Sequence, residues 1–110
     1  MQQLGALPEP VTKGLKALSN PIRQMMLSRL MNGKTSYNRL YRYIMEKLGR
    51  SISPGHFDYH LKLLCSAGLV ESAVYKKGGI RRVYRATELS KNLLDAILKV
   101  YMEAGLCPTQ

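Results

Sequence analysis

The chain has 110 residues, 45% of them hydrophobic, and a net charge of +10 with a pI near 9.9. This length and composition predict one globular domain with a modest core and exclude a disordered chain. The apolar runs are far too short for a membrane span, and no signal-peptide pattern precedes the first predicted helix. We therefore expect a soluble, cytoplasmic protein with no membrane partner.

Helical spacing of apolar residues begins at Val11, so residues 1–10, which contain two prolines, are expected to form an N-terminal arm. Asn20 followed by Pro21 predicts the N-cap and first turn of a second helix, which should end at Asn32-Gly33. A third helix is expected after Thr35 or Ser36. Its apolar face carries Leu40, Ile44 and Leu48, and Gly49 should end it.

A fourth helix is predicted over residues 53–67, with Ser53 as its N-cap and Phe57, Leu61 and Leu64 as its inward stripe. Its flanks and outer side carry hydrogen-bonding residues that are unusual on a plain solvated helix, and its free first-turn N–H groups favour a phosphate. The residues of this helix predicted to contact DNA are Ser53, Gly55, His56, Tyr59, His60 and Lys62. Asp58 has three interpretations: a bond to cytosine N4, a partner that orients an Arg, or an early-turn acid favoured by the helix dipole.

Two β-rich runs around Gly78-Gly79 predict a hairpin over about residues 70–86. Five of the ten residues from Lys76 to Arg85 are Lys or Arg and none is acidic. Like charges on facing strands would repel, so an anionic partner explains the hairpin better than a solvated basic edge does. The predicted contacts are Lys76, Lys77, Arg81, Arg82 and Arg85.

The last helical segment has an apolar stripe wider than packing on a small domain requires. Self-association explains this width, and a simple core helix is the alternative. The residues predicted at a homodimer interface come from the first and last helices: Val11, Leu15, Leu93, Ile97 and Tyr101.

Charge is concentrated in the middle of the chain. Residues 34–85 contain eleven Lys or Arg and three acidic residues, a net +8, whereas residues 1–33 carry +3 and residues 86–110 carry −1. This distribution indicates a polyanionic partner, most often nucleic acid, with an unspecific basic surface as the alternative.

Catalytic and metal-binding patterns are absent from the sequence. It has no Gly-rich phosphate loop, nucleophile elbow, plausible carboxylate pair or Cys/His group with metal-ligand spacing, so we expect no enzyme, no metal site and no cofactor. Two cysteines are too few for a disulfide framework. We expect a structural thiol at Cys65 and a reactive one at Cys107, and a redox switch or disulfide stays open.

The element order helix, helix, helix, helix, hairpin, helix predicts a mostly α, α+β fold. This is a winged helix-turn-helix with four helices, a two-stranded β-hairpin wing and a C-terminal helix. The domain should span residues 11–104, including the terminal dimerisation helices, and residues 105–110 should form a tail.

Four blocks resemble ArsR-type winged helix-turn-helix regulators, especially archaeal ones: LSNPIRQMMLSRL (18–30), SYNRLYRYI (36–44), FDYHLKLLCSAGLVE (57–71) and RRVYRAT (81–87). The resemblance covers about residues 12–100 and implies a dimeric transcription factor that dimerises through its terminal helices.

The metal-sensor motifs of that family are missing from this chain, so metal sensing is not expected. The predicted function is sequence-specific binding of double-stranded DNA by a transcriptional regulator. Helix 53–67 would lie in the major groove, and the basic wing at about 70–86 would lie on the backbone or minor groove. A non-specific, chromatin-type nucleic-acid-binding protein and a winged-helix protein–protein module are the alternatives. The sequence identifies no small-molecule effector.

Overall fold

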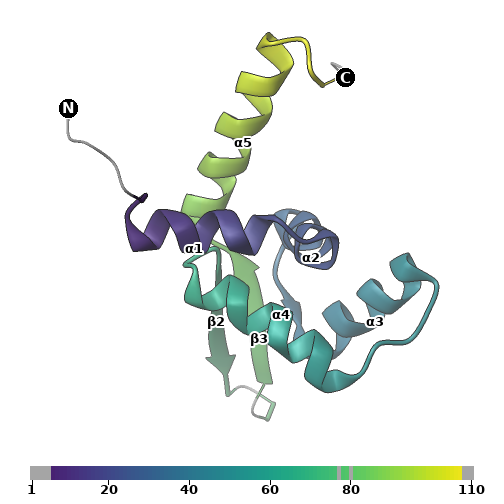
Figure 1. The fold of residues 1–110 in the computed structure, drawn as a ribbon. Coiled ribbons are helices and arrows are strands. Elements are labelled where there is room, and N and C mark those ends of the chain that lie inside the picture. The colour runs from purple at the N-terminus through teal and green to yellow at the C-terminus, as the bar shows by residue number, and fades with distance from the viewer. Residues whose placement is uncertain (1–5, 77, 80, 108–110) are drawn as a thin grey trace.

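The computed structural model describes residues 6–76, 78–79 and 81–107 (Figure 1). In this part of the chain, five helices and three strands confirm the predicted mostly α, winged-helix class. In chain order they are α1 (Glu9–Leu18), α2 (Pro21–Met31), β1 (Thr35–Ser36), α3 (Tyr37–Leu48), α4 (Pro54–Ser66), β2 (Val70–Tyr75), β3 (Arg81–Ala86) and α5 (Glu88–Glu103). None of the described helices is both long and apolar enough to cross a membrane.

Capping side chains explain where the central helices begin. Asn20 Oδ1 accepts hydrogen bonds from the backbone N–H groups of Ile22 and Arg23, and Ser53 Oγ accepts from that of His56. Of the two residues predicted to cap the third helix, Ser36 does so.

Helix α1 begins at Glu9, two residues before the predicted start and inside the segment expected to be an arm. The prolines explain this difference. Pro8 is the N-cap, and Pro10 lies in the first turn, where its missing N–H group leaves no hydrogen bond unmade.

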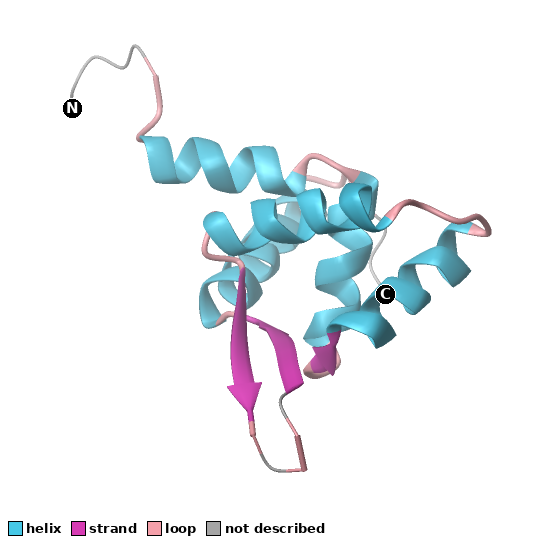
Figure 2. Cartoon of the chain, turned by 90° about the horizontal axis from the view of Figure 1, so that it is seen from below, coloured by secondary structure: helices cyan, strands magenta, loops and turns pink. Residues whose placement is uncertain are grey.

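The sheet is antiparallel with strand order β1-β3-β2. Strands β2 and β3 form the predicted hairpin, which extends from the helical body in Figure 2. Strand β1 was not predicted. It has only two residues, with Thr35 opposite Tyr84 and Ser36 opposite Val83, and it joins α3 to the central strand of the sheet.

One buried core unites α2, α3, α4 and the base of the hairpin. The predicted inward residues Phe57, Leu61 and Leu64 are at most 2% exposed. The Phe57 ring packs edge-on against Tyr37 at 5.1 Å and lies 4.8 Å from the Tyr41 ring, measured between ring centroids. These contacts hold α4 against α3 and fix which side of α4 faces outward.

Helix α5 projects away from the rest of the domain (Figure 1). Its only fully buried residue is Ser90, near its start. A helix of 16 residues is about 24 Å long, so most of α5 lacks packing partners within the described chain.

Candidate nucleic-acid interface

Helix α4 presents a short stripe of exposed side chains on the side opposite the core. His56, Tyr59 and Lys62 follow one another at i, i+3 and i+6, and Tyr59 is 54% exposed. The predicted residues Ser53 and Gly55 are also exposed, at the start of the helix. The stripe can therefore offer hydrogen-bond donors and acceptors to a partner without disturbing the core.

The prediction that His60 contacts DNA from the outer side of α4 is wrong, because this side chain is only 4% exposed. Its Nδ1 atom lies 2.7 Å from a guanidinium nitrogen of Arg23. Since arginine can only donate, His60 Nδ1 accepts this hydrogen bond. Burial first, and then the charges of Arg23 and His56, lower the pKa of His60, so the ring is neutral at pH 7. His60 therefore holds α4 in place through Arg23 and is not available at the surface.

Arg23 is a buried positioning residue that was not predicted from the sequence. The side chain is 5% exposed and also donates to the backbone oxygens of Ala17, at 2.8 Å, and Lys16, at 3.0 Å. It thereby ties the C-terminal end of α1 to the His60 ring of α4. Its position between the buried residues Ile22 and Met26 was the signal available, because an arginine on the inward face of a helix needs buried partners.

Lys62 is paired with Asp58 one turn earlier on α4, with Nζ and Oδ2 3.1 Å apart. The Lys62 side chain is 79% exposed, and exposed pairs of this kind contribute about 1 kcal/mol or less. Lys62 can therefore exchange this partner for a phosphate at small cost. Within the described chain, Asp58 acts as a partner of lysine.

The described cations of the hairpin do not face one another, so the repulsion between facing like charges that the sequence predicted is absent there. Arg81 lies opposite Tyr75, Arg82 opposite Val74, and Arg85 opposite Glu71.

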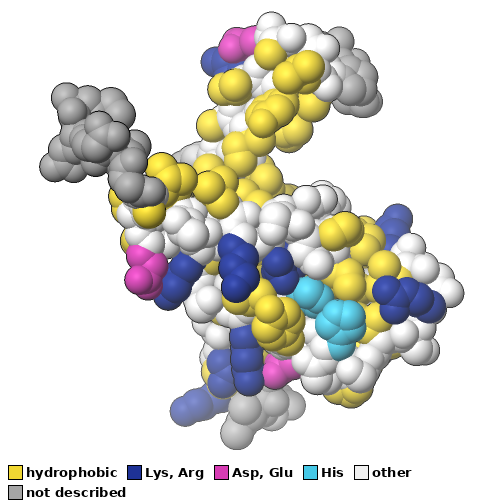
Figure 3. Space-filling model, in the orientation of Figure 1, with side chains coloured by type: hydrophobic (Ala, Val, Ile, Leu, Met, Phe, Trp, Pro, Cys, Tyr) yellow, Lys and Arg dark blue, Asp and Glu magenta, His cyan; other side chains and the backbone are white. Residues whose placement is uncertain are grey.

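The arginines of β3 differ in whether they already have an ionic partner within the chain. Arg85 pairs with Glu71 at 3.0 Å, and Arg82 donates to Ser72 Oγ at 3.1 Å. Arg81, Arg82 and Lys76 are exposed, and Lys77 lies outside the described residues. Figure 3 shows Lys and Arg side chains spread over the face that carries α4 and the hairpin, with few acidic side chains among them. This face is suited to a polyanion.

Cys65, near the C-terminal end of α4, is partly buried, and both Cys65 and Cys107 are free thiols. Arg82 is close enough to Cys65 to favour its thiolate. Burial outweighs that effect and raises the pKa of the Cys65 thiol, which fits a structural residue. Within the described residues, no three His, Cys, Asp or Glu side chains are grouped so that they could hold a metal ion.

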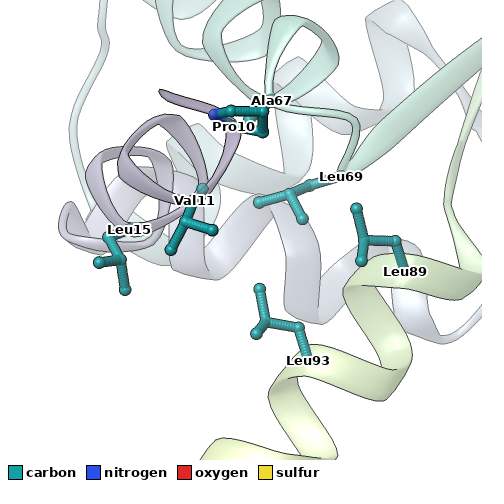
Figure 4. A pocket seen from close by; sticks show the side chains of 8 residues that line it. Pro10, Val11, Leu15, Ala67, Leu69, Leu89 and Leu93 are labelled. Atoms are coloured by element: carbon teal, nitrogen blue, oxygen red, sulfur yellow. The ribbon is translucent and has the colours of Figure 1, made fainter. Parts of the chain in front are cut away.

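The residues predicted at a dimer interface lie together along α1 and α5. Val11, Leu15 and Leu93 line an apolar pocket of about 220 Å³ between α1, α5 and the turn after α4 (Figure 4). Leu15 also borders a second apolar groove together with Ile97 and Tyr101. Val11, Leu15 and Tyr101 are between 46% and 49% exposed.

Comparison with known proteins gives structural neighbours but no sequence relatives. No family model and no curated protein matches the sequence. An ArsR-family transcriptional regulator superposes with a TM-score of 0.65 at 19% identity, covering 91% of this chain and 100% of the other. For the transcriptional repressor BigR from Xylella fastidiosa the TM-score is 0.60 at 27% identity, with coverage of 90% and 88%.

A regulator assigned to the MarR family, from Porphyromonas gingivalis, gives a TM-score of 0.64 at 22% identity, with coverage of 92% and 94%. The ArsR and MarR structures are thus equally similar to this chain. The comparison establishes a winged-helix fold over almost the whole chain and does not separate the two families.

Proposed function

We propose that this protein is a sequence-specific, double-stranded-DNA-binding transcriptional regulator. The observation that carries the proposal is the exposed stripe of His56, Tyr59 and Lys62 on α4, on a helix whose other side is locked into the core. An α-helix fits the major groove of B-DNA, where these side chains would reach base edges. The neighbouring hairpin would place Arg81 and Arg82 against the backbone or in the minor groove.

The two surfaces have different chemistry, and we assign them different roles. The α4 stripe has one cation among directional hydrogen-bonding groups, which suits base readout. The hairpin is rich in long cations, which suits phosphates, and phosphate contacts carry little sequence information. The residues assigned to DNA binding are Ser53, Gly55, His56, Tyr59, Lys62, Lys76, Arg81, Arg82 and Arg85, together with Lys77.

A homodimer is the second part of the proposal, and the exposed apolar surface of α1 and α5 supports it. Leu15, Leu98 and Tyr101 are each about half exposed, and Val100 is 61% exposed. Apolar side chains on a projecting helix stay in water unless a second surface covers them. A second copy of the same helices would cover them, and a stable interface of this kind buries roughly 1,600 Å² in total.

Fold similarity to transcriptional regulators and the sequence blocks described above support the same function. From the sequence we also propose an ArsR-type regulator of archaeal lineage that acts in the cytoplasm.

Selection of bound sequences from a pool of random duplexes tests the DNA-binding proposal. The expected product is an enriched pseudo-palindrome whose half-sites are about 10 bp apart, or a multiple of that. Equal retention of all sequences would identify a non-specific, chromatin-type protein. No retention at low salt would refute DNA binding and favour a protein–protein module.

Sedimentation equilibrium tests the dimer. We expect twice the chain mass at tens of micromolar protein, and a shift toward monomer in Leu15→Glu combined with Ile97→Glu. A monomeric wild-type protein at this concentration refutes the dimer. Lys13→Glu, an exposed change elsewhere on α1, is the control for added negative charge and should leave the mass unchanged.

A further inference from the structure

Asp58 is the only acidic residue between Lys47 and Val70, within the segment that carries most of the net positive charge. It lies on α4 beside the exposed stripe, one turn after Gly55 and one turn before Lys62. Its side chain is 40% exposed, and its Oδ2 atom lies 3.1 Å from Lys62 Nζ. A carboxylate repels phosphates, so its place on a surface that we propose binds a polyanion needs a specific explanation.

The stability of α4 does not provide this explanation. The favourable interaction of an acid with the helix dipole falls off within the first turn, whereas Asp58 comes after the first turn of α4, which begins at Pro54. An exposed ion pair such as that of Asp58 and Lys62 stabilises a helix only weakly. Among the described residues, the ionic partner of Asp58 is this lysine, so the carboxylate does not serve to orient an arginine.

Asp58 lies on the flank of α4 that faces α3 and the sheet. Burial first, and then the negative charge of Asp58, raises the pKa of the Tyr37 hydroxyl at the start of α3. Burial also raises the pKa of Tyr84 on β3, and Asp58 adds to this while the charges of Arg82 and Lys62 oppose it. The carboxylate is therefore close to both surfaces of the proposed DNA interface, the α4 stripe and the hairpin.

The surface beside Asp58 gives a base edge room to approach. Gly55, one turn earlier on α4, is exposed, and a Cβ atom added to it would meet no atom of the described chain within 4 Å. The Lys62 side chain, one turn later, is 79% exposed and can leave its weak pair with Asp58 for a phosphate. Both neighbours of Asp58 along the helix can therefore make way for a partner.

The major groove offers few groups that a carboxylate can bind. The only hydrogen-bond donors on its base edges are the N4 amino group of cytosine and the N6 amino group of adenine. Adenine also presents the acceptor N7 beside its amino group, and this atom repels a carboxylate. Cytosine itself presents no acceptor on its major-groove edge. A carboxylate in the groove therefore favours cytosine over the other three bases.

We propose that Asp58 determines sequence specificity by accepting a hydrogen bond from the N4 amino group of a cytosine in each half-site, while Lys62 moves to a neighbouring phosphate. This role rests on the proposed function, sequence-specific binding of double-stranded DNA. On other sequences the carboxylate meets no suitable donor and repels the backbone. Asp58 therefore lowers the affinity for random DNA, which is a way to gain specificity without tighter binding to the correct site.

Asp58→Asn tests this role, because it keeps the size of the side chain and removes its charge. Base preference is measured with duplexes of the selected site in which single base pairs are exchanged. For the wild type, exchange of one C·G pair in each half-site for T·A should weaken binding about tenfold. In Asp58→Asn the preference at this position should move to adenine, because an amide side chain pairs with adenine N6 and N7. Affinity for random duplexes should rise about threefold, since one repulsive charge is lost.

Glu71→Gln is the matched control, because Glu71 also forms an exposed ion pair, with Arg85 of the hairpin at 3.0 Å. It should raise the affinity for all duplexes similarly and leave the base preference unchanged. Lys62→Gln should weaken binding to every duplex and flatten the slope of log K against log salt by about 0.9, again with the wild-type base preference. Thermal unfolding of all three variants should stay close to that of the wild type, because the pairs that they remove are exposed.

The results separate the role of Asp58 from the proposed function. The role is overturned if Asp58→Asn keeps the base preference of a sequence-specific wild type, as Glu71→Gln is expected to do. It is also overturned if Lys62→Gln changes the base preference in the same way, because Asp58 would then act only by holding Lys62. A wild-type protein that binds all duplexes equally refutes sequence-specific binding itself, and the role of Asp58 with it.

Discussion

Replacing Arg23 by Met should destabilise the domain by about 2–5 kcal/mol. The change removes three hydrogen bonds from a side chain that is 5% exposed. The Lys16 oxygen loses least, because it also accepts from the Ser19 N–H and hydroxyl groups. The Ala17 oxygen and His60 Nδ1 lose a charged donor at 2.8 and 2.7 Å, and an acceptor left unpaired in a buried place costs roughly 1–3 kcal/mol.

Urea unfolding followed by circular dichroism measures this loss. The comparison must use one protein concentration, since self-association adds to apparent stability. With a urea dependence of about 2 kcal/mol per molar, the middle of the range for small domains, the midpoint should fall by roughly 1–2.5 M. Arg29→Met, on the same helix, is the control: its hydrogen bond to Gly33 is exposed, so the loss should stay below about 1 kcal/mol.

A double-variant cycle isolates the contact between the two helices. His60→Leu alone and Arg23→Met alone each leave one member of the pair without its partner. The double variant should therefore be more stable than the sum of the two losses predicts, by about 0.5–3 kcal/mol. A coupling energy near zero, or a loss below about 1 kcal/mol in Arg23→Met, would refute the assigned role of Arg23.

The remaining predictions concern charge, base readout, pH and thiol chemistry. Arg82→Ala should weaken binding to all duplexes similarly and flatten the slope of log K against log salt by about 0.9, whereas Tyr59→Ala should narrow the gap between the selected site and random DNA by ~1–3 kcal/mol. Equal losses for every sequence in folded Tyr59→Ala protein would mean that α4 only clamps the backbone. The pKa of His60 is lower in the folded protein than its unfolded value of about 6.5. At pH values between the folded and the unfolded pKa, His60 therefore takes up a proton when the protein unfolds. Stability should therefore be fully present above about pH 6.5 and decline as the pH falls toward the lowered folded pKa; a His60→Gln protein with the same pH profile would contradict this. Cys107 should react with a thiol reagent well before Cys65, whose pKa is raised by burial, and a reversed order in the folded protein would show that Cys65 is not structural.

Local chemistry made most of the fold predictable from the sequence. Asn20-Pro21 and Ser53-Pro54 each combine a capping side chain with a proline, and both start helices where expected. Phe57, Leu61 and Leu64, which follow helical spacing, were correctly predicted to lie in the core. Signals of this kind act within a few residues, so they can be read without knowledge of tertiary contacts.

The parts that could not be predicted depend on partners far apart in the chain. His60 lies on the flank of the α4 stripe, and periodicity alone does not decide whether a flanking residue is exposed. The side chain that packs over His60 and bonds to it is Arg23, 37 residues earlier in the chain. The pairing of Arg85 with Glu71 depends on the hairpin register, which composition does not reveal. Strand β1 has two residues, too few for any periodic signal.

Arg23 also connects the two surfaces for which we propose partners. Helix α1 exposes Val11 and Leu15 on its proposed dimer side, and its last carbonyl groups are held by Arg23. The same guanidinium group holds His60, which follows Tyr59 on α4, the helix that we propose reads DNA. A shift of α1 in the dimer would stretch these bonds unless α4 moved with it, because a buried charged donor cannot release its acceptors cheaply. In the proposed dimer, a movement of α1 would therefore be transmitted to Tyr59 through one buried side chain. Arg23→Met should loosen that coupling even if both surfaces stay chemically intact.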